Sequence, residues 1–454
     1  MKFTRVMSIV LISLSVIGWG VFIISPNGNA ERLIEQHCDQ AEDYINRGLY
    51  QLAVAEYNDA LMIDSKNEKV WAEKLAAYNL LYADNSDSDI FNAFLEEADA
   101  SVDLFPKNAD FVLIDANLHI EDDDYESAYK VLTRAVESGV KDDSVLALQF
   151  KTKYAFELQY GDYSDVKCMI NNYFIVFDYD HWDYLDGEGN KINTSPVSFA
   201  GPVGESNIRF ISDADSGKNF LVDDETIIHG FFNEIPEDVG VYSEDLIAIK
   251  NDGKYYYYNS LGDVQFDGQS FEFAGTFYDD TAAVKQDGSW CIIDKEGNKV
   301  SDEVYDDIIL NSDYTYNKNS IQILKYKNAS CYSVLYKDKV VGEFDDVGVL
   351  ADDQLIPVCV NAKWGYIDKK GNIVIEPQFI LARSFSNGLA AVYDGKKWGY
   401  IDTNGNLAID YQFYDAGYFS IEGCCLVITD MEFDSETRED QPVWQLLELY
   451  NKID

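Results

Sequence analysis

Few residues in this chain of 454 residues could do chemistry. There are four histidines, His37, His119, His181 and His229, and there is no HExxH, GxSxG or GxxxxGK[ST] motif. Such motifs supply the zinc ligands, the nucleophile or the phosphate-binding loop of large enzyme classes. We therefore predict that the protein is not an enzyme. A site assembled from loops distant in sequence stays open as a third hypothesis.

Seven cysteines are scattered along the chain, and none forms a CxxC pair. The odd number and the spacing favour neither a zinc site nor a disulfide framework. We interpret most of them as small buried apolar residues. The vicinal pair Cys424–Cys425 lies in the apolar run CCLVI, which is typical of a strand.

One acidic loop has the start of a calcium-binding pattern. Asp213 and Asp215 are spaced as oxygen ligands, but Gly217 comes one residue early and the last position is Asp224 instead of Glu. Asp, Gly and Asn are also the residues that hairpins need. We predict no cofactor, with Ca²⁺ as the ion that this loop leaves open.

The formal net charge is −46, and 47% of the residues are hydrophobic. The apolar fraction excludes a disordered chain and allows a sizeable core. A negative field repels phosphate backbones, so we predict no nucleic-acid partner. The charge indicates either solubility or attraction of cations and basic partners.

The N-terminal residues 1–30 read as a membrane signal-anchor. Val6 to Ser25 is a run of twenty residues without a charge, the length that a membrane-spanning helix needs. Lys2 and Arg5 precede it, which predicts a cytoplasmic N-terminus and an extracytoplasmic bulk of the chain. Gly28–Ala30 also fits a cleavage site, so a cleaved signal peptide is the alternative. The expected location is the cell membrane, crossed once.

Residues 31–172 show apolar and small residues at helical spacing. The first stretch carries Ala53, Tyr57 and Ala60 after a turn at Gly48. The plan returns with Ala128, Leu132 and Ala135, in a divergent copy with Phe94, Ala98 and Pro106, and after Gly161 with Val166 and Ile170. These positions predict helical hairpins whose helices approach closely.

This region resembles the tetratricopeptide repeat, a helix–turn–helix unit of 34 residues. Residues 34–67 match best, at Tyr44, Gly48, Ala53, Tyr57 and Ala60, and depart at Ser65, where the family usually has Pro. The resemblance implies three to four stacked copies and a face that binds a peptide or protein. A spacer that only holds the next domain away from the membrane is the alternative.

Residues 173–454 contain a repeated ten-residue phrase. KWGYIDKKGN begins at Lys363 and KWGYIDTNGN at Lys397, so Trp364 and Trp398 lie 34 positions apart. About seven copies of this unit occur along the region. They align at Trp182, Asn219, Tyr255, Trp290, Tyr332, Trp364 and Trp398.

The last copy predicts three short strands joined by tight turns. Trp398 and Tyr400 point to one face, and Gly399 between them leaves room for another backbone or ring. Asp402 ends the strand, where its carboxylate can accept hydrogen bonds from turn amides, and Gly405 supplies a positive φ. We interpret the phrase as one meander of a β-repeat array.

These residues resemble the WG (KWG) repeat of bacterial proteins, over roughly residues 175–430. The resemblance implies a repeat module that is often joined to membrane anchors and tetratricopeptide repeats, usually without assigned chemistry. Short strands in this number favour a β-propeller-like domain, with an open β-solenoid as the alternative. The tail from Val443 would be a last closing strand or a short helix. The structural positions predicted for the repeat are Trp182, Tyr255, Trp290, Trp364, Gly365, Asp368, Gly371, Trp398, Gly399, Asp402 and Gly405.

The predicted fold is thus a transmembrane helix, an α-solenoid of tetratricopeptide-like hairpins and an all-β WG-repeat domain. The predicted function is a membrane-anchored extracytoplasmic scaffold that binds a protein or peptide partner. A cell-wall or glycan-binding surface protein is the second hypothesis. Its candidate residues are Tyr256 and Tyr258, which alternate with Tyr255 and Tyr257 and could stack on sugars.

Overall fold

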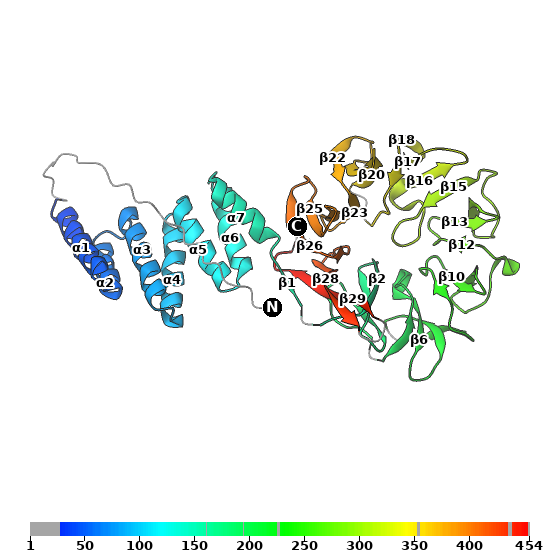
Figure 1. Cartoon of the computed structure of the whole chain (residues 1–454), viewed down its shortest axis with the longest axis horizontal. Helices are drawn as coiled ribbons and strands as arrows, with labels where there is room; N and C mark the ends of the chain where they lie inside the picture. The colour runs from blue at the N-terminus through cyan, green and yellow to red at the C-terminus, as the bar shows by residue number, and fades with distance from the viewer. Residues whose placement is uncertain are drawn as a thin grey trace. The chain divides into compact units, whose positions relative to one another are not determined.

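The structure is a computed structural model of the whole chain (Figure 1). It describes residues 28–159, 161–193, 195–224, 228–351, 355–434 and 438–452. The chain divides into two compact units, Met1–Leu146 and Ala147–Asp454. We call them the helical unit and the β unit.

The described part of the chain contains seven α-helices, and the last of them spans the division between the two units. Consecutive helices up to α6 pack against each other as antiparallel neighbours (Figure 1). Their bounds are α1 Gly28–Asn46, α2 Tyr50–Ile63, α3 Glu68–Asp84, α4 Ser88–Leu104, α5 Ala109–Glu121, α6 Tyr125–Glu137 and α7 Asp143–Lys153.

Capping residues and small residues explain why these helices begin where they do and pack so closely. The side chains of Asn67, Asn108 and Asp124 accept hydrogen bonds from backbone amides in the first turns of α3, α5 and α6. Ala53 and Ala128, which the sequence pattern singled out, are completely buried. Alanine lets two helix backbones approach, so the predicted helical hairpins are present.

The helical copy predicted after Gly161 is wrong. Asp165–Ile170 forms strand β2, paired with β3, Tyr173–Phe177. Val166 and Ile170 are β-branched and fit a strand as well as a helix, and the pairing with β3 decides between the two. The helices therefore end at Lys153 and the strands begin at Phe156.

The described residues of the β unit form six sheets. In sheet order, the first three comprise β2 Asp165–Ile170, β3 Tyr173–Phe177, β4 Trp182–Leu185, β5 Val197–Ala200, β6 Arg209–Asp213, β7 Asn219–Val222 and β8 Ile228–Phe232; then β11 Lys254–Asn259, β10 Leu246–Asn251 and β9 Asp238–Val239; then β12 Phe273–Ala274, β13 Thr281–Gln286, β14 Ser289–Asp294, β15 Tyr305–Ile309, β16 Ile321–Tyr326, β17 Tyr332–Tyr336 and β18 Lys339–Phe344. The other three comprise β19 Asp346–Val347, β20 Ile356–Val360, β21 Lys363–Ile367 and β22 Ile373–Phe379; then β23 Leu381–Ser386, β24 Leu389–Tyr393, β25 Trp398–Asp402 and β26 Leu407–Phe413; then β1 Phe156–Leu158, β29 Glu439–Leu449, β28 Cys424–Asp434 and β27 Asp415–Ala416.

Each seven-stranded sheet consists of two repeat modules that meet at one residue pair. Trp182 pairs with Val197 between β4 and β5, and Trp290 pairs with Tyr305 between β14 and β15. Both pairs are antiparallel, and all other neighbours in these sheets share longer ladders. In both sheets, the pair formed by the Trp therefore joins the last strand of one repeat copy to the first strand of the next copy.

The tail forms a further module beyond the seven that were predicted. Its long hairpin, β28 and β29, is completed by β1 from the start of the β unit, with Phe156 opposite Leu449. The tail is thus a strand and not a helix. In an open solenoid, the first and last strands would lie at opposite ends, whereas β1 and β29 pair directly here.

The fold class predicted for this unit is corrected to six separate sheets, none of which closes on itself within the described residues. Each sheet has a linear strand order with two edge strands. Turn spacing and strand propensity report local strands, but they do not report how the hydrogen-bond ladders end.

The predicted membrane anchor is also corrected. Within the residues that the structure describes, no helix is long and apolar enough to cross a bilayer, and α1, the longest at 19 residues, carries charged side chains such as Glu31, Arg32 and Glu35. The run Val6–Ser25 lies outside the described residues. A transmembrane helix, a single-pass topology and a location in the cell membrane are therefore not supported.

Candidate functional site

The second aromatic of the repeated phrase is buried and hydrogen-bonded to a distant backbone carbonyl. Tyr184, Tyr257, Tyr366 and Tyr400 are at most 1% exposed. Each hydroxyl donates to the carbonyl oxygen of a residue 17 or 18 positions later, over 2.6 to 3.0 Å. Burial raises the pKa of each phenol well above its usual range. These tyrosines are neutral structural donors that tie one module to the next.

The Trp positions of the phrase differ in burial. Trp290 and Trp398 are buried, whereas Trp182 and Trp364 are half-buried. The guanidinium carbon of Arg383 lies 4.7 Å from the centre of the Trp398 ring, within the range of a cation–π contact. The buried rings of Trp290 and Trp398 are therefore packing residues.

The glycines that follow Trp364 and Trp398 are required by a close backbone approach. A Cβ atom at Gly399 would lie 2.7 Å from the carbonyl oxygen of Ile409, and one at Gly365 would lie 2.5 Å from that of Ile375. Both contacts are shorter than real Cβ atoms show. Glycine therefore lets the neighbouring backbone pack close at both positions.

The aspartate of the phrase closes a tight turn. One carboxylate oxygen of Asp402 accepts hydrogen bonds from the amides of Asn404 and Asn406. Asp368 accepts the equivalent bonds from the amides of Lys370 and Asn372. Gly371 and Gly405 both have a φ of 84°. A hydrogen bond from the Asn372 side chain lowers the pKa of the Asp368 carboxyl. The residues that recur in the phrase thus all have structural roles.

The two candidate sugar-stacking tyrosines lie on β11. Tyr255 and Tyr257 are buried, and Tyr256 and Tyr258 are half-buried. The Tyr258 ring packs against Phe232, with 5.5 Å between ring centres. Tyr258 is therefore part of an internal aromatic contact.

The acidic loop does not gather its carboxylates. Asp213 accepts a hydrogen bond from the amide of Ser216 at 2.7 Å, in the turn between β6 and β7. Asp224 is 2.6 Å from a guanidinium nitrogen of Arg209. Asp213 and Asp224 thus each have a protein partner, as expected for a turn.

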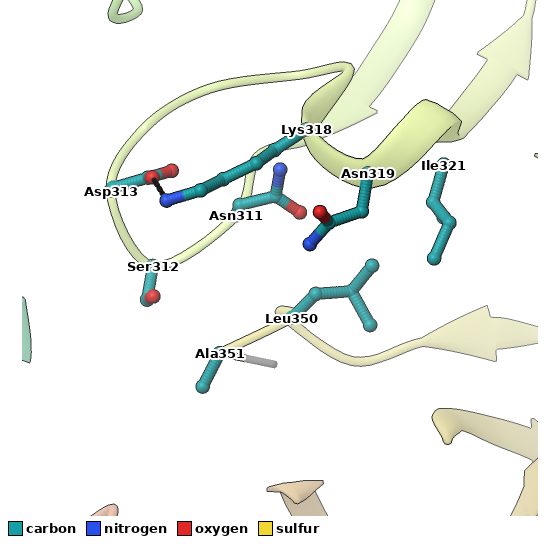
Figure 2. Close-up of a pocket in the computed structure, with 8 residues that line it drawn as sticks. All are labelled: Asn311, Ser312, Asp313, Lys318, Asn319, Ile321, Leu350 and Ala351. Atoms are coloured by element: carbon teal, nitrogen blue, oxygen red, sulfur yellow. Dashed lines mark hydrogen bonds and ion pairs between the residues drawn. The ribbon is translucent and has the colours of Figure 1, made fainter. Parts of the chain in front are cut away.

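The hollow in Figure 2 is too small for a substrate. Its volume of about 30 Å³ is roughly that of one water molecule. Asp313 in its wall forms an ion pair with Lys318 and accepts hydrogen bonds from Thr315. Its polar wall is therefore satisfied within the protein.

A larger, open hollow of about 360 Å³ is lined by Asn171, Asn172, Tyr173, Asp186, Gly187, Glu188, Asn207 and Glu422. Asn172 donates to Glu422 at 2.7 Å and accepts from the amide of Ile421 at 2.9 Å. No histidine or cysteine lies in this lining, so it offers neither a thiol nucleophile nor an imidazole base.

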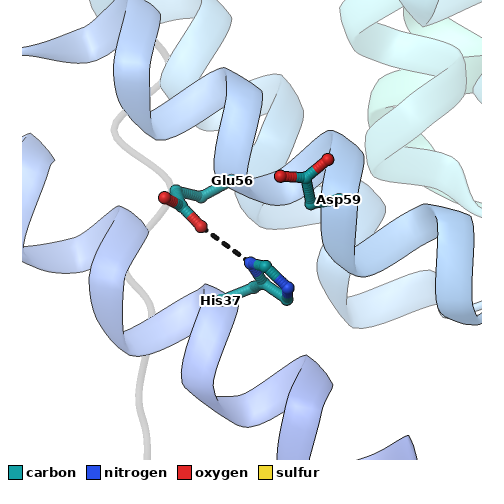
Figure 3. Close-up of side chains that lie close together, drawn as sticks. All are labelled: His37, Glu56 and Asp59. Atoms are coloured by element: carbon teal, nitrogen blue, oxygen red, sulfur yellow. Dashed lines mark hydrogen bonds and ion pairs between the residues drawn. The ribbon is translucent and has the colours of Figure 1, made fainter.

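Three groups of side chains in the described residues could hold a metal ion. Figure 3 shows the first, in which Nδ1 of His37 is 2.7 Å from a carboxylate oxygen of Glu56, beside the exposed Asp59. In the second, Asp178, His181 and Asp183, the ammonium of Lys191 lies 2.7 Å from Asp183. Both groups already contain a close ionic partner.

The third group differs from these two. Asp115 and His119 lie one turn apart on α5, and Asp99 reaches them from α4. Burial and then the neighbouring Asp99 raise the pKa of the Asp115 carboxyl to about 8. The spacing of Asp115 and His119 was a visible signal, but Asp99 is brought in only by helix packing.

Comparison with known proteins identifies the repeat of the β unit. A family model described as WG containing repeat matches residues 270–290, 364–398 and 398–430, which is less than half of the chain. No curated protein matches the chain.

Solved structures that are similar to parts of the chain are also found. The first tetratricopeptide domain of RPAP3 (Spaghetti) bound to an HSP90 peptide is 16% identical, covering 27% of this chain and 93% of that one, with a TM-score of 0.22. Hsv2p of Kluyveromyces lactis is 11% identical, covering 63% and 96%, with a TM-score of 0.35. Such scores carry no argument about function. The family match does show that residues 270–430 carry WG-containing repeats.

Proposed function

We propose that this protein is a repeat-based scaffold that binds a protein or peptide partner and catalyses no reaction. The observation that carries the proposal is that the residues of the repeated phrase build the fold itself. Its Trp, Gly, Tyr and Asp positions are all occupied by packing, close backbone approach or turn hydrogen bonds. A repeat whose recurring residues build the core leaves recognition to its variable surface.

The surface charge favours a basic partner. The turn between α3 and α4 exposes Asp84, Asp87 and Asp89, and the end of α5 exposes Glu121, Asp122 and Asp123. The hydroxyl of Tyr82 donates to Glu121 at 2.9 Å, which joins these two places. We call these six carboxylates the acidic turn surface. Segments 82–91 and 118–126 contain no Lys or Arg. Such a surface attracts and orients a Lys- or Arg-rich segment.

The test measures binding of the full chain to fluorescent peptides that are rich in Lys and Arg. A peptide of equal length with Asp and Glu in their place is the reference. We expect binding of the basic peptide only, and weaker binding as salt increases.

The first variant combines Asp84→Asn, Asp87→Asn, Glu121→Gln and Asp122→Asn. Asn at position 87 still caps α4, so the helix keeps its start. We expect this variant to bind about tenfold less tightly, equivalent to about 1.4 kcal/mol. The control variant removes four exposed carboxylates of the β unit: Asp252→Asn, Asp279→Asn, Asp287→Asn and Glu296→Gln. Equal loss in both variants would mean that net charge alone attracts the peptide, and no preference between peptides would refute the basic partner.

A further inference from the structure

The strongest unexplained group in the helical unit is the buried carboxylate of Asp115. Its residue is 0% exposed, and neither carboxylate oxygen has a hydrogen-bond partner among the described residues. Leaving a buried carboxylate unsatisfied is costly, so such a group normally has a counter-ion or a ligand. The neighbours of Asp115 show which ligand would suit it.

The donor atoms around Asp115 have the separations of a metal site. Nε2 of His119 lies 3.9 Å from Oδ1 of Asp115 and 3.4 Å from Oδ1 of Asp99. All three donor atoms lie within 4.8 Å of one another. A tetrahedral ion with bonds of about 2.0–2.1 Å places its ligand atoms roughly 3.4 Å apart. The three atoms therefore need only small shifts to share one ion.

The other nitrogen of His119 faces a third carboxylate. Nδ1 lies 3.6 Å from Oδ2 of Asp124, and the other oxygen of Asp124 caps α6 through the amide of Ser127. Histidines that bind metals usually turn their second ring nitrogen toward a carboxylate or carbonyl, which fixes the ring. Asp124 is held in place by its cap and is positioned for this role.

The cations near the group are paired with other carboxylates. Arg134 acts on Asp115, but its guanidinium is 2.9 Å from Asp103. Lys130 acts on Asp124, but its ammonium pairs with Glu126. Asp99, Asp115 and Asp124 face His119 with no Lys or Arg ion pair of their own among the described residues. In the group around His181, by contrast, the ammonium of Lys191 already lies 2.7 Å from Asp183.

We propose that Asp99, Asp115 and His119 bind one divalent transition-metal ion of the Zn²⁺ type, with Asp124 orienting the histidine. Two carboxylate oxygens and one imidazole nitrogen form a donor set that suits Zn²⁺ and Co²⁺. The Asp99 side chain is 54% exposed, so the ion enters from solvent and keeps an open position there. The site joins α4 to α5 and would hold the helical hairpins together.

The experiment uses the full chain after treatment with a chelator. Co²⁺ is added while its visible absorption is followed, and Zn²⁺ is then used to displace it. We expect one Co²⁺ per chain with the bands of a four- or five-coordinate ion, full displacement by Zn²⁺, and a higher melting temperature in the presence of Zn²⁺. Binding of several weak ions without those bands would refute the site.

Matched variants locate the ion. Asp99→Asn should abolish stoichiometric binding, whereas Asp103→Asn, the same change one turn along α4, should not. Asp124→Asn should weaken binding by about 10- to 100-fold, because Asn keeps the cap but loses the charge. Asp115→Asn should also abolish binding, and circular dichroism checks that it folds. Unchanged binding in Asp99→Asn, or loss of binding in Glu56→Gln or Asp183→Asn, would overturn the assignment.

Discussion

The hydroxyl of Tyr400 donates to the backbone carbonyl of Gly417 at 3.0 Å and lies 3.3 Å from the sulfur of Cys425. Tyr400 is on β25, and Gly417 directly follows β27 in the next module. The same bond recurs from Tyr184, Tyr257 and Tyr366. Contact between successive modules is therefore made by a polar bond inside an aromatic core.

Tyr400→Phe should destabilise the protein by about 1–3 kcal/mol, because the ring stays but the buried carbonyl loses its donor. Denaturant unfolding of the full chain measures the change. Tyr256→Phe, at a half-buried position on β11, is the control and should change the stability by less than about 0.5 kcal/mol. Equal changes in the free energy of unfolding for the two substitutions would show that the bond to Gly417 does not stabilise the fold.

The buried tyrosines predict the alkaline limit of the fold. Their pKa values are raised above the ordinary value of 10 by burial, so above that pH the folded chain binds more protons than the unfolded one. Their stabilisation is complete below pH 10 and is lost as the pH rises through the folded pKa. Tyrosinate absorbance and circular dichroism, followed together, should show these four groups ionising only as the chain unfolds.

The size of this effect can be checked with Tyr400→Phe. Removing one such tyrosine should reduce the slope of stability against pH, above pH 10, by up to about 1.4 kcal/mol per pH unit. An unchanged slope would mean that Tyr400 ionises freely in the folded protein.

Gly399→Ala should cost several kcal/mol, because the new Cβ would meet the Ile409 carbonyl and the amide of Tyr411 on β26. The backbone there must move, which breaks ladder bonds. Gly240→Ala is the matched control, since its Cβ would meet the Ala248 side chain at an ordinary 3.4 Å. Thermal unfolding should separate the two variants clearly, and similar melting temperatures would contradict the close approach.

Trp398→Ala should cost about 3–5 kcal/mol, the usual range for a large buried aromatic residue. Trp364→Ala should cost less, because Trp364 is half-buried although it occupies the same register, opposite Phe379 as Trp398 is opposite Phe413. Denaturant unfolding of both variants compares them directly. A larger loss of stability in Trp364→Ala than in Trp398→Ala would contradict this link between burial and stability.

Some of this protein could be predicted from single segments. The buried alanines of the helical hairpins, the turn hydrogen bonds of Asp402 and the close approach at Gly399 follow from local spacing. Each depends on neighbours within one helix pair or one hairpin, where the chain itself fixes the distance. The same local logic failed at Asp165–Ile170, because its apolar residues suit either a helix or a strand.

Other features depend on segments that are distant in sequence. β1 completes the last module by pairing Phe156 with Leu449, and no periodicity of the sequence predicts that partner. The separation of Asp115 and His119 is visible on α5, but the place of Asp99 depends on how α4 packs.

The sequence by itself determined the repeat, its turns and its small-residue contacts, because these are set by bonds and spacing along a few residues. The tertiary structure decided the edges of the sheets, the partner of the tail and the carboxylate–histidine group. Those features exist only where separate elements meet, and the free energy that selects such meetings is shared among many side chains.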